Sequence, residues 1–255
     1  MNTVELNKLY NIDCMEGMKL FPDKYFQLAI VDPPYGINAP NMSMGSNKSR
    51  KGDGYPGVSV AEKLRKGRLN AGAGKLKNRA LNKMPIAWDY EKPSPEYFKE
   101  LFRVSQNQII WGGNYFDLPP TRGIVCWDKC QPWENFSQWE MAWTSFDRPA
   151  ALYRLSNTGG ANTEKKIHPT QKPVKLYEWL LAKYAVKGDR ILDTHVGSAS
   201  SLIACHNYGF DYIGFEIDNQ YYTDADNRLS KVKAQLSLIP VIEQIEIFEE
   251  EGIKT

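Results

Sequence analysis

The chain has 255 residues, a length typical of one large domain or two small ones. Its hydrophobic share of 42% and charged share of 24% exclude a disordered chain, a collagen-like fibre and a coiled coil. No apolar run reaches the roughly 18 residues that span a bilayer, and the first residues carry acids where a secretion signal has an apolar segment. The four scattered cysteines include no CxxC pair, so we expect no disulfides, no metal site and a cytoplasmic location.

The net charge of +2 is distributed unevenly along the chain. Residues 41–85 contain eleven Lys or Arg and two Asp or Glu, a net charge of +9, which leaves −7 for the rest. An asymmetry of this size predicts an acidic partner that is contacted at one place.

The elements expected first along the chain are a strand, a helix and a strand. Residues 9–13 form a short strand that ends in an acid, 15–21 a helical turn or two, and 26–32 an apolar strand stopped by two prolines. Residues 37–86 are rich in glycine and poor in large apolar side chains, which indicates a long loop with one short helix at 61–70.

Regular structure is expected again from residue 95 onward. A helix at 95–105 is followed by strands at 107–113 and 123–129. Five of the seven tryptophans lie between residues 111 and 143, which indicates an aromatic-rich core.

The last third of the chain alternates strands with helices. The expected helices are 172–185, 198–209 and 219–236, and the expected strands open the segments 189–197 and 212–218. This alternation predicts an α/β fold with a mostly parallel sheet. The acidic end, 245–255, is typical of a solvated tail.

The tetrapeptide Asp32-Pro33-Pro34-Tyr35 directly follows an apolar strand. Ligands of open α/β sheets sit at the carboxyl ends of strands, so we expect Asp32 at the edge of a binding crevice. The two prolines lack N–H donors but present their carbonyls in a stiff turn, and Tyr35 adds a flat ring. This combination predicts a site for a planar group that bears an NH₂, although two prolines also end a strand without any function.

The turn Asp193–Ser198 and the acid Glu216 follow two later strands. A glycine at 197 lets a ligand approach the backbone, and the helix N-terminus favours polar groups. The pattern is not GxGxxG, so a dinucleotide site is unsupported and a tight turn explains it equally well. Glu216, about twenty residues further on, is well placed to hold ribose hydroxyls, or it is an ordinary acid before a helix.

The hexapeptide His168–Pro173 precedes another helix. It places the hydroxyl of Thr170, the amide of Gln171 and the ammonium of Lys172 in one proline-bounded turn. These groups can hold a carboxylate, and a plain loop that caps the helix is the equal alternative.

These four motifs together resemble those of the amino-methyltransferases that methylate exocyclic amines in DNA with S-adenosylmethionine. VDPPYG is similar to their catalytic motif, ILDTHVGS to their cofactor glycine motif, and HPTQKPVKL to the segment that holds the methionine end of the cofactor. GFEID, with Tyr221, Ala225 and Arg228, resembles their ribose-binding strand and the helix after it. The catalytic motif comes first, an order that resembles the beta class. Thr194-His195 and Ala199 depart from the family, which usually has Pro-Phe and glycine there.

The resemblance implies a Rossmann-like, S-adenosylmethionine-dependent methyltransferase fold with helices on both faces of the sheet and a circularly permuted motif order. It implies a single domain, 1–255, with a basic insert at about 37–86 and a short target-recognition segment at about 148–166. The implied catalytic residues are Asp32, Pro33, Pro34 and Tyr35. The implied cofactor residues are Asp13, Cys14, His168, Thr170, Gln171, Lys172, Asp193, Thr194, His195, Val196, Gly197, Ser198, Glu216 and Ile217.

The implied reaction is site-specific methylation of N6 of a flipped-out adenine in double-stranded DNA. Asp32 and the Pro33 carbonyl accept the two N–H bonds of the amine, and Tyr35 stacks on the base. Cys130 lacks the preceding proline of a C5-cytosine nucleophile, so we interpret it as structural. Phosphate contacts are expected from the insert, through Lys48, Arg50, Lys51, Lys63, Arg65, Lys66, Arg68, Lys75, Lys77 and Arg79.

Several alternatives stay open at this point. An N4-cytosine methyltransferase presents the same amine, although such enzymes more often carry Ser where this chain has Asp32. Methylation of RNA or of a glutamine amide, and a DNA-binding protein with a vestigial catalytic site, are further alternatives. A homodimer and a cognate restriction endonuclease are open as partners, whereas a membrane is not expected.

Overall fold

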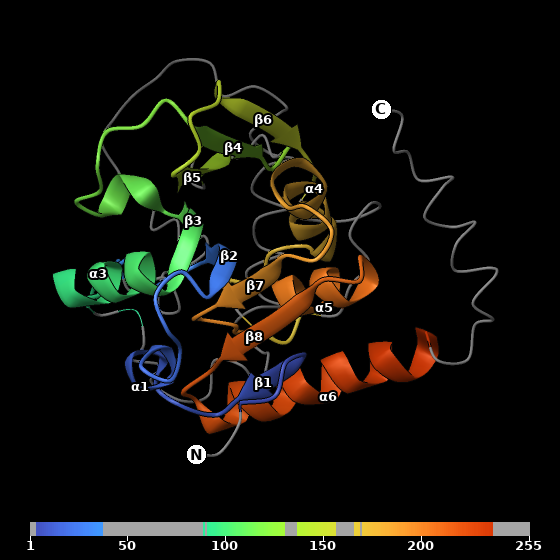
Figure 1. Cartoon of the computed structure of the whole chain (residues 1–255). Coiled ribbons are helices and arrows are strands. Elements are labelled where there is room, and N and C mark those ends of the chain that lie inside the picture. Colours follow the sequence, from blue (N-terminus) through green and yellow to red (C-terminus); the bar gives the residue numbers. More distant parts are fainter. Residues whose placement is uncertain are drawn as a thin grey trace, which may run out of the picture.

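The computed structural model describes residues 4–37, 89, 91–130, 137–156, 166–168 and 170–236. In this part of the chain, eight strands form one sheet in the order β1-β8-β7-β2-β3-β5-β4-β6 (Figure 1). The strands are β1 (Lys8–Tyr10), β2 (Phe26–Val31), β3 (Ser105–Trp111), β4 (Ile124–Asp128), β5 (Trp139–Thr144), β6 (Ala151–Arg154), β7 (Arg190–Asp193) and β8 (Asp211–Phe215). All neighbouring pairs are parallel except those that β5 makes with β3 and β4. The predicted α/β fold with a mostly parallel sheet is confirmed.

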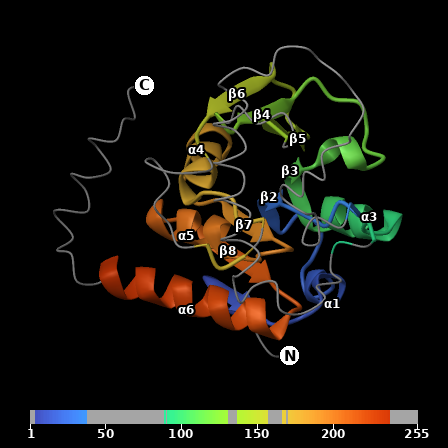
Figure 2. The ribbon, with the colours of Figure 1, turned by 180° about the vertical axis from the view of Figure 1, so that it is seen from behind.

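Helices cover both faces of this sheet, as the views from opposite sides show (Figures 1 and 2). They are α1 (Cys14–Met18), α3 (Pro95–Val104), the 3₁₀ turn η3 (Gly113–Tyr115), α4 (Val174–Tyr184), α5 (Ser200–Asn207) and α6 (Asn219–Leu236). Leu28 and Ile30 of β2 belong to the core under α4 and α5, whereas Ala29 and Val31 belong to the core under α1 and α3. Because β2 is buried on both faces, its sequence is a continuous apolar run rather than an alternating one.

The centre of the sheet is the point where the chain connections turn in opposite directions. Strand β2 lies between β7 and β3, and the sheet continues from β7 through β8 to β1 on one side. Ligands of open α/β sheets bind beside the carboxyl ends of strands at such a switch point. Asp32 follows β2 and Asp193 ends β7, so the fold places the predicted catalytic motif next to the predicted cofactor motif despite their separation in sequence.

The sequence predictions and the structure differ mainly between residues 137 and 156. Strands β5 and β6 were not predicted, and β6 occupies the start of the segment expected to recognise the target. Trp111 and Trp127 are buried as expected, whereas Trp139 is 51% exposed. The helix expected at 61–70, nearly all of the basic insert with its Lys and Arg residues, and the acidic tail lie outside the described residues.

The described residues also bear on cysteines, metals and membranes. All four cysteines carry free thiols. No group of His, Cys, Asp or Glu among the described side chains has the geometry of a metal site. Of the helices described, none combines the length and apolar character that crossing a bilayer requires.

Candidate active site

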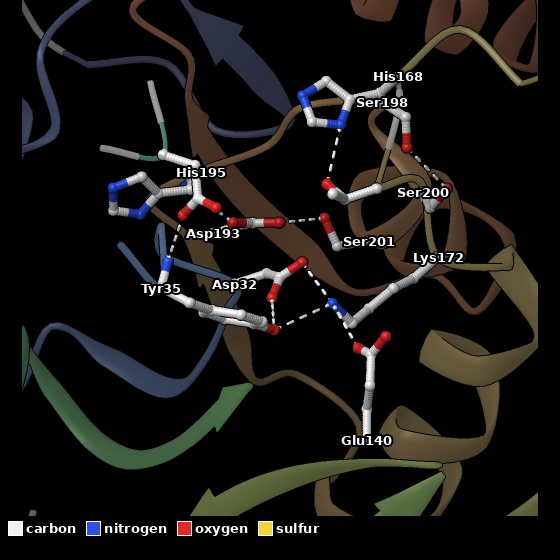
Figure 3. Close-up of polar contacts among 12 residues, drawn as sticks. Asp32, Tyr35, Glu140, His168, Lys172, Asp193, His195, Ser198, Ser200 and Ser201 are labelled. Atoms are coloured by element: carbon white, nitrogen blue, oxygen red, sulfur yellow. Dashed lines mark hydrogen bonds and ion pairs between the residues drawn. The ribbon is translucent and has the colours of Figure 1, made fainter. Parts of the chain in front are cut away.

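A buried ion pair lies at the carboxyl end of β2. Asp32 accepts a hydrogen bond from the hydroxyl of Tyr35 at 2.5 Å through Oδ1, and one from Lys172 Nζ at 2.5 Å through Oδ2 (Figure 3). The side chain of Asp32 is 17% exposed and that of Lys172 is 4% exposed. The structure therefore joins the tetrapeptide and the hexapeptide, and both oxygens of the predicted catalytic carboxylate are engaged.

Two further charges extend this pair into a buried network. Lys172 Nζ lies 3.1 Å from Glu140 Oε2 on β5, and the other carboxylate oxygen of Glu140 pairs with Lys129. Although burial alone raises the pKa of Glu140, Lys172 and Lys129 lower it to about 2. Burial likewise opposes the charge of Lys172, but Asp32 and Glu140 together raise its pKa. The network contains two carboxylates and two ammonium groups, so its charges balance.

Sequence reasoning did not identify Glu140 or Lys129 as part of the site. The available signal was an acid within the apolar run WEMAWT, where a buried carboxylate needs a cation. That signal was missed because strand β5 itself was not predicted.

The turn at Tyr35 is fixed by contacts from distant parts of the chain. The carboxylate of Asp89, also missed from sequence, accepts hydrogen bonds from the backbone N–H of Tyr35 at 2.6 Å and of Gly36 at 2.9 Å. The Tyr35 ring stacks on Tyr115, with centroids 4.9 Å apart and planes inclined by 13°. Gly112, with φ +68°, is required here because a Cβ would overlap the Tyr35 ring. The ring expected to stack on a base thus already has an aromatic neighbour.

The turn after β7 is built around the buried carboxylate of Asp193. It accepts hydrogen bonds from the hydroxyl of Ser201 and, at 3.0 Å, from the backbone N–H of His195. Burial, with a smaller contribution from the nearby Asp32, raises the pKa of Asp193 to about 7 against the opposing effect of these hydrogen bonds. Gly197 takes φ +55° and packs beneath the ring of His168.

Glu216 lies at the end of β8, next to this turn. Its Oε2 accepts the backbone N–H of Gly197 at 2.8 Å, and its Oε1 accepts that of Asp218 at 2.9 Å. Each carboxylate oxygen has two lone pairs, so both retain capacity for a ligand hydroxyl. Ile217 is 65% exposed, an apolar side chain beside the carboxylate.

Helix α6 holds the same turn from the other side. Arg228 donates to the carbonyl of Ser198 at 2.6 Å and to the hydroxyl of Ser200 at 3.0 Å. Tyr221 packs edge-on against His168, with ring centroids 4.3 Å apart. Arg228 therefore supports the turn directly, and Tyr221 supports it through His168. Within the turn, Val196 donates its backbone N–H to the carbonyl of Phe215 at 3.1 Å.

A chain of neutral polar groups links α3, the β7 turn and α1. The hydroxyl of Thr194 lies 2.6 Å from that of Tyr97 and 2.9 Å from His195 Nδ1. His195 Nε2 lies 4.0 Å from Cys14 Sγ. Burial lowers the pKa of His195 to about 4 and raises that of the Cys14 thiol to about 12, so both are neutral near pH 7. Asp13 caps α1 by accepting the N–H of Met15 at 2.8 Å.

The polar side chains of the hexapeptide His168–Pro173 contact different partners. Thr170 Oγ1 lies 3.1 Å from His168 Nδ1, and Gln171 Oε1 accepts the N–H of Ile167 at 3.0 Å. Burial, together with the positive charge of Lys172, lowers the pKa of His168 to about 3. Only Lys172 among these residues reaches Asp32, whereas the sequence had grouped it with the cofactor residues.

Comparison with known proteins gives the family. A family model described as DNA methylase matches residues 51–227, more than two thirds of the chain. The chain belongs to the DNA methylase family. Its resemblance to the DNA amino-methyltransferases is thereby confirmed, and the family includes N6 and N4 enzymes alike. The match contains the β7 and β8 turns, the hexapeptide and Glu140, and it begins after the Asp32 tetrapeptide.

The curated relatives are type II methyltransferases. Over 81 residues the chain is 35% identical to the type II methyltransferase M.HpaI of Haemophilus parainfluenzae, covering 32% of this chain and 26% of that protein. Over 144 residues it is 26% identical to the type II methyltransferase M2.DpnII of Streptococcus pneumoniae, covering 56% and 49%. The chain thus spans between a quarter and a half of the length of these relatives.

Among solved structures, the cytosine-N4-specific PvuII DNA methyltransferase is similar in fold. The TM-score is 0.51 and the sequence identity 14%, with 91% of this chain and 92% of that chain covered. This likeness agrees with a DNA methyltransferase fold for the eight-stranded sheet.

Proposed function

We propose that this chain is a DNA methyltransferase that transfers a methyl group from S-adenosylmethionine to the N6 amino group of a flipped-out adenine. The observation that carries the proposal is the position of the Asp32 carboxylate, in a stiff turn at the switch point of the sheet and beside the β7 and β8 turns. A hydrogen-bond acceptor for an amine and a turn suited to a nucleoside thus lie at neighbouring strand ends.

The residues at the ends of β7 and β8 fit S-adenosylmethionine. The carboxylate of Glu216 would accept the ribose hydroxyls, and the exposed side chain of Ile217 would contact the adenine ring. Asp13, Cys14 and His195 would border the adenine, and the Gly197 turn would lie along the rest of the molecule. When bound, S-adenosylmethionine supplies a methyl group already activated as a sulfonium.

The residues after β2 would prepare the amine. The lone pair of adenine N6 is delocalised into the ring, which makes it a poor nucleophile. Asp32 and the Pro33 carbonyl would accept the two N–H bonds, draw the nitrogen toward tetrahedral geometry and aim its lone pair. The product nitrogen carries an extra proton, which Asp32 Oδ1 would accept. Because a paired base cannot reach this turn, the target must leave the helix.

Double-stranded DNA is the proposed partner, contacted through the basic insert of a single catalytic domain. The net charge of +9 on residues 41–85 suits a phosphate backbone. Replacing Lys63, Arg65, Lys66 and Arg68 by Gln is expected to reduce the slope of log K against log salt by about 0.9 for each lost phosphate contact. An unchanged slope would contradict the contact.

One assay tests the proposed reaction. The purified chain is incubated with methyl-labelled S-adenosylmethionine and unmethylated genomic DNA, RNA or protein, and the products are digested and identified by mass spectrometry. We expect N6-methyladenine from the DNA alone. N4-methylcytosine would move the specificity to cytosine, and label confined to RNA or protein would overturn the proposal.

A further inference from the structure

We propose that Lys172, held in place by Glu140, is a positioning residue for the catalytic carboxylate and does not bind the carboxylate of the cofactor. This inference rests on the proposed function, because it assigns a role within the methyl-transfer site. It concerns the two elements that sequence reasoning kept apart, the hexapeptide before α4 and the acid on β5.

Protein oxygens surround the Lys172 ammonium, which donates hydrogen bonds to two of them and forms an ion pair with the third. An ammonium has three N–H donors, and three oxygens surround this one: Asp32 Oδ2 at 2.5 Å, Glu140 Oε2 at 3.1 Å and the Tyr35 hydroxyl at 3.4 Å (Figure 3). The buried indole of Trp111 covers it further, with the ring centroid 5.2 Å from Nζ. A ligand carboxylate would have to displace one of these partners.

The charge of Glu140 explains how an ammonium can lie so near the reacting amine. Positive charge moves onto the amine nitrogen as the methyl group is transferred, so an unbalanced cation nearby would oppose the reaction. Glu140 balances Lys172, and Lys129 balances Glu140. Lys172 can therefore hold Asp32 Oδ2 without adding net positive charge to the site.

In this arrangement the two carboxylate oxygens of Asp32 have different roles. Lys172, anchored by two carboxylates, keeps Oδ2 engaged. Among the residues that the structure describes, the oxygen Oδ1 accepts a hydrogen bond only from the hydroxyl of Tyr35, a neutral donor. The incoming amine therefore exchanges with the Tyr35 hydroxyl at Oδ1, while the ion pair keeps the carboxylate in one orientation.

The test is the variant Lys172→Met, with Lys175→Met as the matched control. Lys175 is an exposed lysine in the first turn of α4, three residues further along. We expect Lys172→Met to lower single-turnover methylation of unmethylated genomic DNA by about 100-fold, since a misplacement near 1 Å can cost that much. We expect its dissociation constant for S-adenosylmethionine, measured by calorimetry, to stay within threefold of wild type. The control should change neither value.

A second pair of variants keeps the test decisive if Lys172→Met does not fold. Glu140→Gln should also slow methyl transfer and spare cofactor affinity, because it frees Lys172 and leaves a net positive charge. The double variant Lys172→Met, Glu140→Gln removes one charge of each sign. If Glu140 acts through Lys172, the double variant is no slower than Lys172→Met alone.

Two results would overturn the inference and leave the proposed function in place. The first is a tenfold or larger loss of cofactor affinity in folded Lys172→Met, with methyl transfer at saturating cofactor unchanged. This result would show that Lys172 binds the cofactor. Rate losses of Lys172→Met and Glu140→Gln that multiply in the double variant would show that the two residues act independently. If the wild type and Lys175→Met methylate no DNA, the proposed function itself fails, and the inference fails with it.

Discussion

The two acidic regions of the site keep their carboxylates in different ways. At the end of β2, Asp32 and Glu140 are held by ammonium groups. At the ends of β7 and β8, Asp193 and Glu216 accept from a hydroxyl and from backbone N–H groups, and in the described part of the chain neither forms an ion pair. The pKa values of the two regions differ accordingly. The lysines lower the pKa of Glu140 to about 2, whereas burial raises the pKa of Asp193 to about 7.

This difference matches two different tasks. Methyl transfer to an amine needs one ionised acceptor in a fixed orientation, and a paired cation provides it. Holding a nucleoside needs acceptors for neutral hydroxyls and a closely approached backbone, which the Gly197 turn and Glu216 would provide in the proposed function. Changes at the end of β2 should therefore affect the rate of methyl transfer, and changes at the ends of β7 and β8 should affect cofactor affinity.

The largest expected effect is that of Asp32→Ala. Removing one preorganised polar group of this kind typically costs about 10²–10³ in rate. We expect that loss in single-turnover methylation, with cofactor affinity nearly unchanged in calorimetry. A variant that retains more than a tenth of the wild-type rate would remove Asp32 from the catalytic role.

The second prediction concerns pH and Asp193→Asn. Because folding raises the pKa of Asp193 from 3.8 to about 7, the folded state binds this proton more tightly than the unfolded chain. Wild type should therefore lose stability relative to the variant, by roughly 2–4 kcal/mol, as the pH rises from 4 to 7. Urea unfolding of both proteins across this range measures it, and a constant difference would contradict the buried acid.

The third prediction concerns Glu216, which we propose holds the cofactor at the end of β8. Glu216→Ala should weaken S-adenosylmethionine binding by about 10- to 150-fold, because hydrogen bonds to charged groups contribute about 1.5–3 kcal/mol. Glu216→Gln keeps the shape and one acceptor oxygen, so its loss should be smaller. If folded Glu216→Ala binds S-adenosylmethionine with unchanged affinity, Glu216 does not hold the ribose.

The smallest expected effect is that of Tyr35→Phe. The change keeps the ring that stacks on Tyr115 and removes the hydroxyl that occupies Asp32 Oδ1. A net hydrogen bond contributes about 0.5–1.5 kcal/mol, so KM for DNA should fall by about 2- to 12-fold. A higher KM would mean that the hydroxyl assists the target base and does not compete with it.

Local patterns predicted the elements that carry strong periodicity or burial. The run FQLAIV predicted β2, and α6 has the bounds expected from its sequence. Strand β5 could not be predicted in this way, because it depends on pairing with β3 and β4 and contains a partly buried acid. Asp32 and Glu216 were identified at strand ends, whereas Glu140 acts through Lys172, 32 positions away, and Asp89 through Tyr35, 54 positions away. Such contacts follow from the tertiary fold.

We assign methyl transfer to the end of β2 and cofactor binding to the ends of β7 and β8. A crystal structure of the chain with S-adenosylmethionine bound tests this assignment most directly. The ribose hydroxyls should lie within hydrogen-bond distance of Glu216, and the sulfonium methyl should face Asp32 Oδ1 beside the carboxyl ends of β7 and β2. Lys172 should remain on Asp32 and Glu140. A cofactor whose ribose lies away from Glu216, or whose carboxylate takes the Lys172 ammonium from Asp32, would contradict the assignment of the two strand ends.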